Sequence, residues 1–144
     1  MSWETKAWGR TRPTDSAPGL FSNHELEILA GGFCSLHYHE QRANQFYIIE
    51  GTLRIVEVYG WDVRVRTLRN GDRYTIPSLV THQFQAITAV KCEERYFADR
   101  NGIVVDTDII RLTIGGICPN GILASGVQVT ATEYTTLDIR RSIA

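Results

Sequence analysis

Residues 31–51 read GGFCSLHYHEQRANQFYIIEG, and this stretch decides the fold that we expect. His37 and His39 are one residue apart, and on a β-strand residues i and i+2 lie on the same face. Both imidazoles would therefore point one way, which is how a sheet offers two nitrogen ligands to one metal ion. The run Phe-Tyr-Ile-Ile at 46–49 is rich in residues that favour strands. The stretch thus predicts strands that carry a candidate metal site.

The rest of the chain continues this pattern of short strands. Residues 53–58, 63–68 and 82–87 are further β-prone runs, and Asn70-Gly71 is a strong turn signal. Val, Ile and Thr supply 38 of the 144 residues, whereas helical signals are weak. We therefore predict an all-β fold, either a sandwich or a barrel.

Length, charge and hydropathy narrow the range of functions. A chain of 144 residues suits one domain, which we divide into an N-terminal arm (1–20), a β-barrel (21–114) and a C-terminal extension packed on the barrel (115–144). The formal net charge of −1 leaves no basic excess to bind nucleic acid. No apolar run approaches the roughly 20 residues of a membrane span, and the first residues lack a signal-peptide core. We expect a cytoplasmic protein that binds neither nucleic acid nor membrane.

Two motifs with defined spacing specify the fold further. The first is Gly31-x5-His37-x-His39-x4-Asn44-x6-Gly51, and the second is Gly71-x5-Pro77-x4-His82. In order and spacing, both resemble the two motifs of the cupin superfamily, which implies a single-domain jelly-roll barrel, also called a double-stranded β-helix. The resemblance also implies that His37, His39 and His82 hold one divalent metal ion. It leaves the identity of the metal open among Zn, Fe, Mn, Ni and Co.

The chain departs from the family pattern at three positions. Asn44 stands where the family has an acidic ligand, Leu79 replaces a glycine, and Ala86 replaces an asparagine. A neutral amide oxygen is a weaker donor than a carboxylate, so we assign Asn44 as a weak or water-mediated fourth neighbour of the metal. Three neutral histidines leave a divalent metal with more residual positive charge, and it would then polarise a bound oxygen more strongly.

Three short segments are similar to the cupin domain of bifunctional mannose-6-phosphate isomerases. Lys6-Ala7-Trp8-Gly9 resembles that domain's Lys-Pro-Trp-Gly, Arg42-Ala43-Asn44 its Arg-Ala-Glu, and residues 106–111 its closing Glu-Asp-Asp-Ile-Val-Arg. This likeness implies sugar-isomerase-like Lewis-acid chemistry on a carbohydrate or carboxylated small molecule. Arg111, at the family's closing arginine, is the candidate for holding a substrate anion.

Several alternatives stay open. Strand parity turns Phe46 and Phe84 inward, either as a substrate lining or as barrel core. Three histidines without a carboxylate also resemble the Fe(II) sites of thiol and diketone dioxygenases in this superfamily, and a non-catalytic small-ligand or metal-binding cupin is the third hypothesis. No residue is identified as the catalytic base, and His24, outside both motifs, is expected at the surface. We expect a homodimer, since small cupins resemble one another in pairing through sheet edges.

Overall fold

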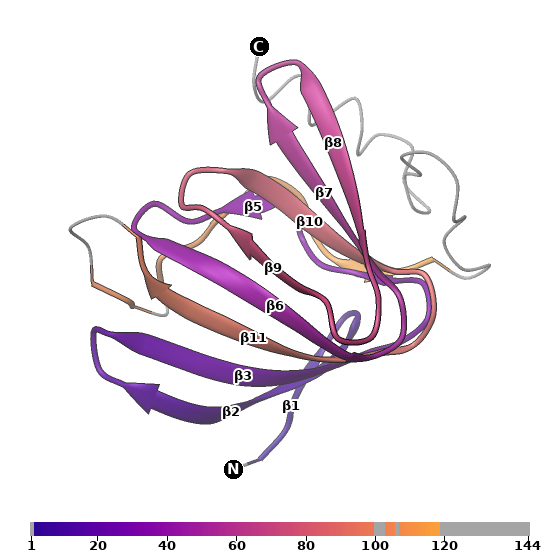
Figure 1. Ribbon diagram of the computed structural model, residues 1–144, viewed down its shortest axis with the longest axis horizontal. Coiled ribbons are helices and arrows are strands. Elements are labelled where there is room, and N and C mark those ends of the chain that lie inside the picture. The colour runs from indigo at the N-terminus through magenta and orange to yellow at the C-terminus, as the bar shows by residue number, and fades with distance from the viewer. Residues whose placement is uncertain (1, 100–102, 106, 119–144) are drawn as a thin grey trace.

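The computed structural model describes residues 2–99, 103–105 and 107–118, which form two antiparallel β-sheets around a common core (Figure 1). The first sheet has the strand order β1-β2-β3-β11-β6-β9. Its strands are β1 (Glu4–Lys6), β2 (Gly9–Ala17), β3 (Phe21–Ile28), β11 (Val90–Ala98), β6 (Arg42–Glu50) and β9 (Arg73–Ile76).

The second sheet has the order β12-β5-β10-β4-β13, and the β7–β8 hairpin joins it through pairing of β7 with β10. Its strands are β12 (Ile110–Arg111), β5 (His37–Tyr38), β10 (Thr81–Ala86), β4 (Gly32–Phe33), β13 (Gly116–Ile117), β7 (Leu53–Tyr59) and β8 (Asp62–Leu68). The described residues contain strands and turns but no helix, so the all-β prediction is confirmed. No helix among these residues is long and apolar enough to cross a membrane.

Strand periodicity places the core between the two sheets. Along β11, every second side chain from Val90 to Glu94 is buried, and the residues between them are exposed. On β6 the same parity buries Phe46, as the sequence predicts, and also Ile48, and it leaves Ile49 46% exposed. The largest hydrophobic cluster joins the inner faces of both sheets through Leu26, Ile28, Cys34, Phe46, Ile48, Leu53, Ile55, Leu68, Ile76, Phe84, Ala86, Val90 and Cys92.

The N-terminal segment differs from the arm that the sequence predicts. Residues 4–17 form β1 and β2, and β2 pairs with β3 along its length. The pairing register shifts between Pro13 and Asp15, and such a bulge accommodates a proline that cannot donate to the ladder. Of the C-terminal extension, Gly116–Ile117 pairs with β4; the prediction for 119–144 lies outside the described residues.

Two turn positions show how the motif residues shape the backbone. Gly51 has φ 101°, and a Cβ there would lie 2.2 Å from the carbonyl oxygen of Ala89, so the end of the first motif requires glycine. Leu79, where the family has glycine, has φ 70°. A left-handed backbone costs a leucine roughly 1–2 kcal/mol, and its amide donates to the carbonyl of His39 at 2.6 Å. The strained residue therefore directly adjoins the histidine loop.

Candidate metal centre

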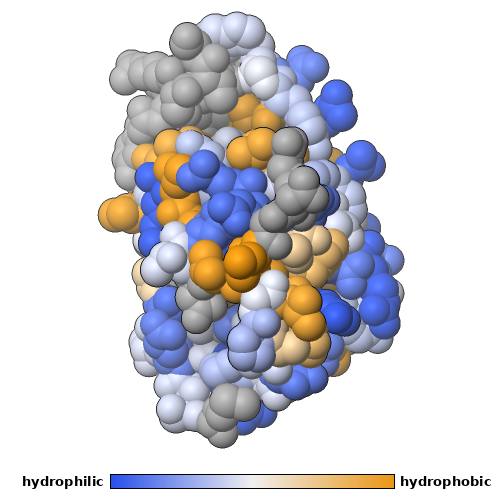
Figure 2. All heavy atoms as spheres, turned by 90° about the vertical axis from the view of Figure 1, so that its left-hand side faces the viewer, coloured by the Kyte–Doolittle hydropathy of each residue, from blue (hydrophilic) through white to orange (hydrophobic). Residues whose placement is uncertain are grey.

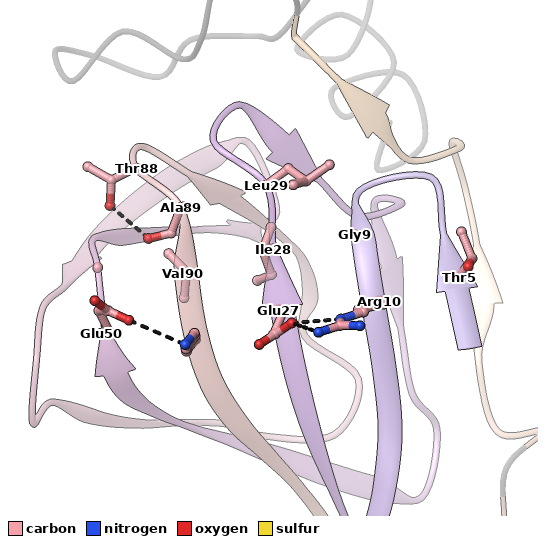
Figure 3. Close-up of a pocket in the computed structure, with 12 residues that line it drawn as sticks. Thr5, Gly9, Arg10, Glu27, Ile28, Leu29, Glu50, Thr88, Ala89 and Val90 are labelled. Atoms are coloured by element: carbon pink, nitrogen blue, oxygen red, sulfur yellow. Dashed lines mark hydrogen bonds and ion pairs between the residues drawn. The ribbon is translucent and has the colours of Figure 1, made fainter. Parts of the chain in front are cut away.

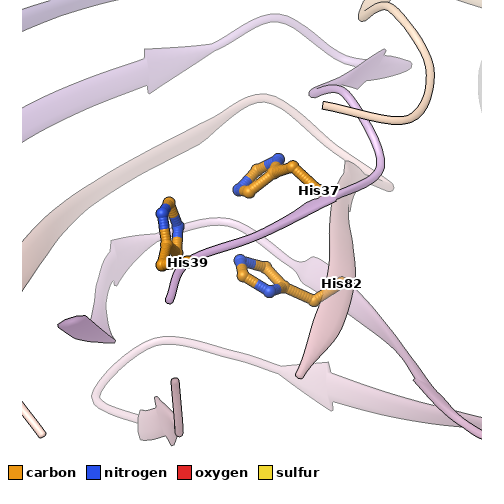
Figure 4. A group of neighbouring side chains, drawn as sticks. All are labelled: His37, His39 and His82. Atoms are coloured by element: carbon orange, nitrogen blue, oxygen red, sulfur yellow. The ribbon is translucent and has the colours of Figure 1, made fainter. Parts of the chain in front are cut away.

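Three of the four histidines converge where β5 ends and β10 begins. His37 lies on β5 and His82 on β10, and the two residues are direct partners across this antiparallel pair. His39 follows β5 on the same face as His37. One ring nitrogen of each lies within 4.8 Å of the others, and the three rings point toward one another (Figure 4). The structure thus brings together the three residues that the two motifs single out.

The second nitrogen of each imidazole is held by a backbone carbonyl. Nδ1 lies 2.7 Å from the oxygen of Ser35 in His37, 2.7 Å from that of Asp108 in His39 and 2.8 Å from that of Val80 in His82. A carbonyl oxygen only accepts hydrogen bonds, so each Nδ1 carries the proton and each Nε2 keeps its lone pair. Backbone partners of this kind orient the histidines of metal sites and set their tautomer.

One contact competes with this assignment at His39. The Nε of Arg42 lies 3.3 Å from Nδ1 of His39, which could accept from it only without a proton. The contact of Nδ1 with the Asp108 carbonyl oxygen is shorter, at 2.7 Å. If Nδ1 carried no proton, its lone pair would face a lone pair of that oxygen, which is unfavourable. We therefore assign the proton to Nδ1.

The free nitrogens fit a divalent metal ion. Nε2 of His39 and of His82 is buried, and neither has a hydrogen-bond partner among the described residues. A buried polar atom without a partner costs roughly 1–3 kcal/mol. Three neutral imidazole nitrogens converging in this way are the donor set that Zn, Fe, Ni and related ions accept.

Burial keeps these imidazoles neutral. It lowers the pKa of His39 to about 4 and that of His82 to about 3. The pKa of His37 also lies well below its ordinary value, first through burial and then through the charges that His82 and His39 would carry. At neutral pH the three side chains are therefore unprotonated at Nε2, the form that binds metal.

We expect the metal-free protein to lose stability as the pH falls from about 7 to about 4. In the unfolded chain a histidine has an ordinary pKa of about 6.5 and becomes protonated in this window, whereas the folded imidazoles stay neutral. The unfolded state then binds more protons than the folded state, so the free energy of unfolding decreases as the pH is lowered. Between pH 7.5 and 5.5 each histidine contributes about 1 kcal/mol to this loss.

Urea denaturation of the metal-free protein at pH 7.5, 6.5 and 5.5 measures this dependence. Glu94 acts in the opposite sense, because burial raises its pKa above the ordinary value and makes the folded state bind the extra proton. If the urea concentration at the midpoint of unfolding did not decrease from pH 7.5 to pH 5.5, the three histidines would not be neutral and buried in the folded protein.

A buried carboxyl group that the sequence did not reveal lies behind Asn44. Nδ2 of Asn44 donates to Oε2 of Glu94 at 2.9 Å, and Tyr96 also bonds to Glu94. This contact turns Oδ1 of Asn44 away from Glu94, and Oδ1 has no partner among the residues that the structure describes. The ring of Tyr96 in turn lies 5.4 Å from that of His39. The first motif therefore lacks its acidic side chain at residue 44, but an acidic side chain on β11, Glu94, is hydrogen-bonded to the amide group of Asn44.

Two arginines bring positive charge to the histidines. Arg111 on β12 is the direct partner of His37 on β5, so both side chains share one face of this ladder. Its charge contributes to lowering the pKa of His37 and His39. Within the described residues no ion pair engages Arg111. Arg42 is buried and stacks 3.8 Å from the ring centre of Tyr96.

The remaining candidates occupy the interior. Phe46 and Phe84 are 1% and 4% exposed and belong to the hydrophobic core, and the ring of Trp8 packs edge-on against Phe84. Their role as a substrate lining stays a prediction. His24 is half-buried rather than exposed: its ring packs 5.7 Å from that of Tyr96. Strand β3 turns this side chain inward, beside Glu94 of β11.

The two hollows described on the surface do not contain the histidines. One of about 720 Å³ lies at the opposite end of β6 from Asn44, beside the ion pairs Arg10–Glu27 and Glu50–Lys91 (Figure 3). The other, of about 390 Å³, adjoins residues 103–105. Figure 2 shows hydrophobic side chains gathered in the middle of one face. The donor geometry, and not cavity size, therefore identifies the candidate site.

A family comparison matches most of the barrel. The family described as Cupin matches residues 13–97, which include both motifs and all three clustered histidines. No curated protein matches the chain.

Solved structures resemble the fold. The oxalate decarboxylase from Bacillus subtilis at pH 4.6 matches with a TM-score of 0.65 and 17% identity, over 77% of this chain and 30% of that one. A tryptophan-to-tyrosine variant of that enzyme gives a TM-score of 0.64 and 18% identity with the same coverage. A third structure, from work on that enzyme's Mn(II) centres, gives 0.63 and 17%, again over 77% and 30% of the two chains. The chain thus spans about three tenths of these proteins, and the likeness establishes the fold.

Proposed function

Because this chain belongs to the cupin family, we propose that it is a metal-dependent cupin whose His37, His39 and His82 bind one divalent ion and a small anionic ligand. The observation that carries the proposal is the convergence of three ring nitrogens within 4.8 Å, with each Nδ1 held by a carbonyl. Two of the Nε2 atoms are buried without a partner.

The charges around the histidines favour an anionic ligand. Three neutral ligands leave the charge of a divalent ion uncompensated, and Arg111 adds a further positive charge beside His37. A small molecule with two carboxylates would neutralise this charge: one carboxylate would bind the metal ion, and the guanidinium of Arg111 would bind the other. Oxalate, the substrate named for the similar decarboxylase, is the simplest probe of this class.

The favoured reaction is sugar-isomerase-like chemistry, in which the metal acts as a Lewis acid on a bound oxygen. Two buried carboxyl groups can serve as proton carriers. Glu94 is one. Glu57 is the other: it is the partner of His82 across the β7–β10 pair and accepts hydrogen bonds from Tyr59 and Tyr74. The alternatives remain a three-histidine Fe(II) dioxygenase, favoured by the neutral ligand set, and a non-catalytic binding protein.

Elemental analysis of protein purified without chelator tests the proposal. We expect about one divalent ion per chain, and relaxation measurements on Mn(II)-loaded protein should show saturable oxalate binding. Iron directs the next assay to oxygen uptake, whereas Zn, Mn, Co or Ni directs it to isomerase substrates. Ligand binding without turnover under any metal would identify a binding protein. No metal, even after reconstitution, would overturn the proposed function.

A further inference from the structure

Residues 107–111, which we call the strap, cross the loop that carries His39. Within the strap, Ile110 and Arg111 form β12 and pair with Tyr38 and His37 of β5. His39 lies beyond the end of β5, so no sheet ladder fixes its backbone. Its orientation must come from contacts outside the strand.

The Leu79 amide holds the carbonyl of His39, and Asp108 of the strap holds the imidazole and the residues that follow it, through its backbone carbonyl and its side chain. Its carboxylate accepts the amide hydrogens of Glu40 at 2.8 Å, Gln41 at 2.9 Å and Arg42 at 3.1 Å. Its backbone carbonyl accepts Nδ1–H of His39 at 2.7 Å. One residue therefore binds both the backbone that follows His39 and the imidazole of His39. Both sets of hydrogen bonds depend on the position of Asp108.

This arrangement gives a role to Asp108, which lies in a segment where the sequence indicates a role for Arg111 alone. Together, the Asp108 bonds and the β12 pairing engage every residue from 37 to 42. The same strap sets Arg111 beside His37. The loop of the first motif is thus fastened to a segment that neither motif includes.

We propose that Asp108 is a positioning residue of the histidine centre, which aims Nε2 of His39 at the other two imidazoles by holding the 39–42 loop and the Nδ1 proton together. The part of this proposal that concerns metal affinity rests on the proposed function. The part that concerns the tautomer and orientation of His39 does not, because both exist in the metal-free protein.

Asp108→Asn tests the role, with Asp72→Asn as the matched control. An asparagine keeps one acceptor oxygen but turns an NH2 group toward amide hydrogens, so the loop loses at least one bond. Asp72 also caps a turn, through the amide of Arg69 at 2.8 Å, but the turn joins β8 to β9. We expect the Mn(II) dissociation constant to rise by about 10- to 100-fold in Asp108→Asn and to change less than about twofold in Asp72→Asn. A folded Asp108→Asn protein with unchanged Mn(II) affinity would overturn the proposal.

Nitrogen-15 NMR of the metal-free protein gives a second readout. In the wild type, His39 should be protonated at Nδ1 alone, and in Asp108→Asn it should become a mixture of tautomers. A wild-type His39 protonated at Nε2 would overturn the proposal even if the variant failed to fold. If the wild type binds no metal but the tautomer shifts as expected, the proposed function fails and the positioning role stands.

Discussion

Replacing His82 with alanine is expected to reduce bound metal from about one ion per chain to almost none. The variant removes one of three ring nitrogens, and no other His, Cys, Asp or Glu in the described part of the chain joins this group to replace it. The dissociation constant should rise by more than about 100-fold, beyond the effect of losing an outer partner. Elemental analysis and a competition titration with a chelating dye measure the change.

His24→Ala is the matched control for this experiment. His24 is the fourth histidine; its ring packs against Tyr96, its Nε2 lies 2.7 Å from Oγ of Ser22, and it does not belong to the group of converging ring nitrogens. Its removal should leave the metal content at the wild-type level. A full metal complement in His82→Ala, or equal loss in both variants, would show that the site is assigned to the wrong residues.

The second large effect concerns the charge at Asn44. From the family pattern alone, Asn44→Glu should tighten metal binding, because it restores the acidic ligand. In the structure, however, the new carboxylate would meet Glu94, which Asn44 contacts at 2.9 Å in the buried interior. An uncompensated buried charge costs on the order of 3–5 kcal/mol. We therefore expect Asn44→Glu alone to lower the free energy of unfolding of the metal-free protein by this amount.

Adding Glu94→Gln should reverse the effect. The double variant has one carboxylate again, now at the position of the family's ligand, and should recover most of the stability and bind Mn(II) about tenfold more tightly or better. Glu94→Gln alone keeps an acceptor for Asn44 and should leave metal affinity near that of the wild type. A double variant with unchanged affinity would mean that residue 44 does not face the metal.

The histidine cluster could be predicted because its information is local. Strand parity predicts that His37 and His39 face one way, which holds although His39 lies just past the end of β5, and the spacing to His82 matches a known motif. Parity likewise placed Phe46 and Phe84 inside. Glu94 could not be identified in this way, because its contact with Asn44 depends on the pairing of β11 with β6. The two residues are 50 positions apart in the sequence.

The strap and the N-terminal strands escaped prediction for related reasons. The segment 106–111 was singled out, but only the three-dimensional structure shows the carboxylate of Asp108 at the backbone of residues 40–42. Pro13 favoured an arm over a strand, and the bulge that admits it is a property of the β2–β3 pair. In each case the missing information lies in the contact between distant segments.

The long separation between the strap and the first motif bears on how the protein folds. His39 and Asp108 are 69 residues apart, and the contact forms only after the chain has closed that distance. Contacts of this span make folding slow, since the loop-closure entropy is lost before they stabilise the chain. We therefore expect the complete histidine centre to form late in folding. A metal that binds only the finished barrel would lengthen the lifetime of the native state by slowing unfolding, and would leave the rate of folding unchanged.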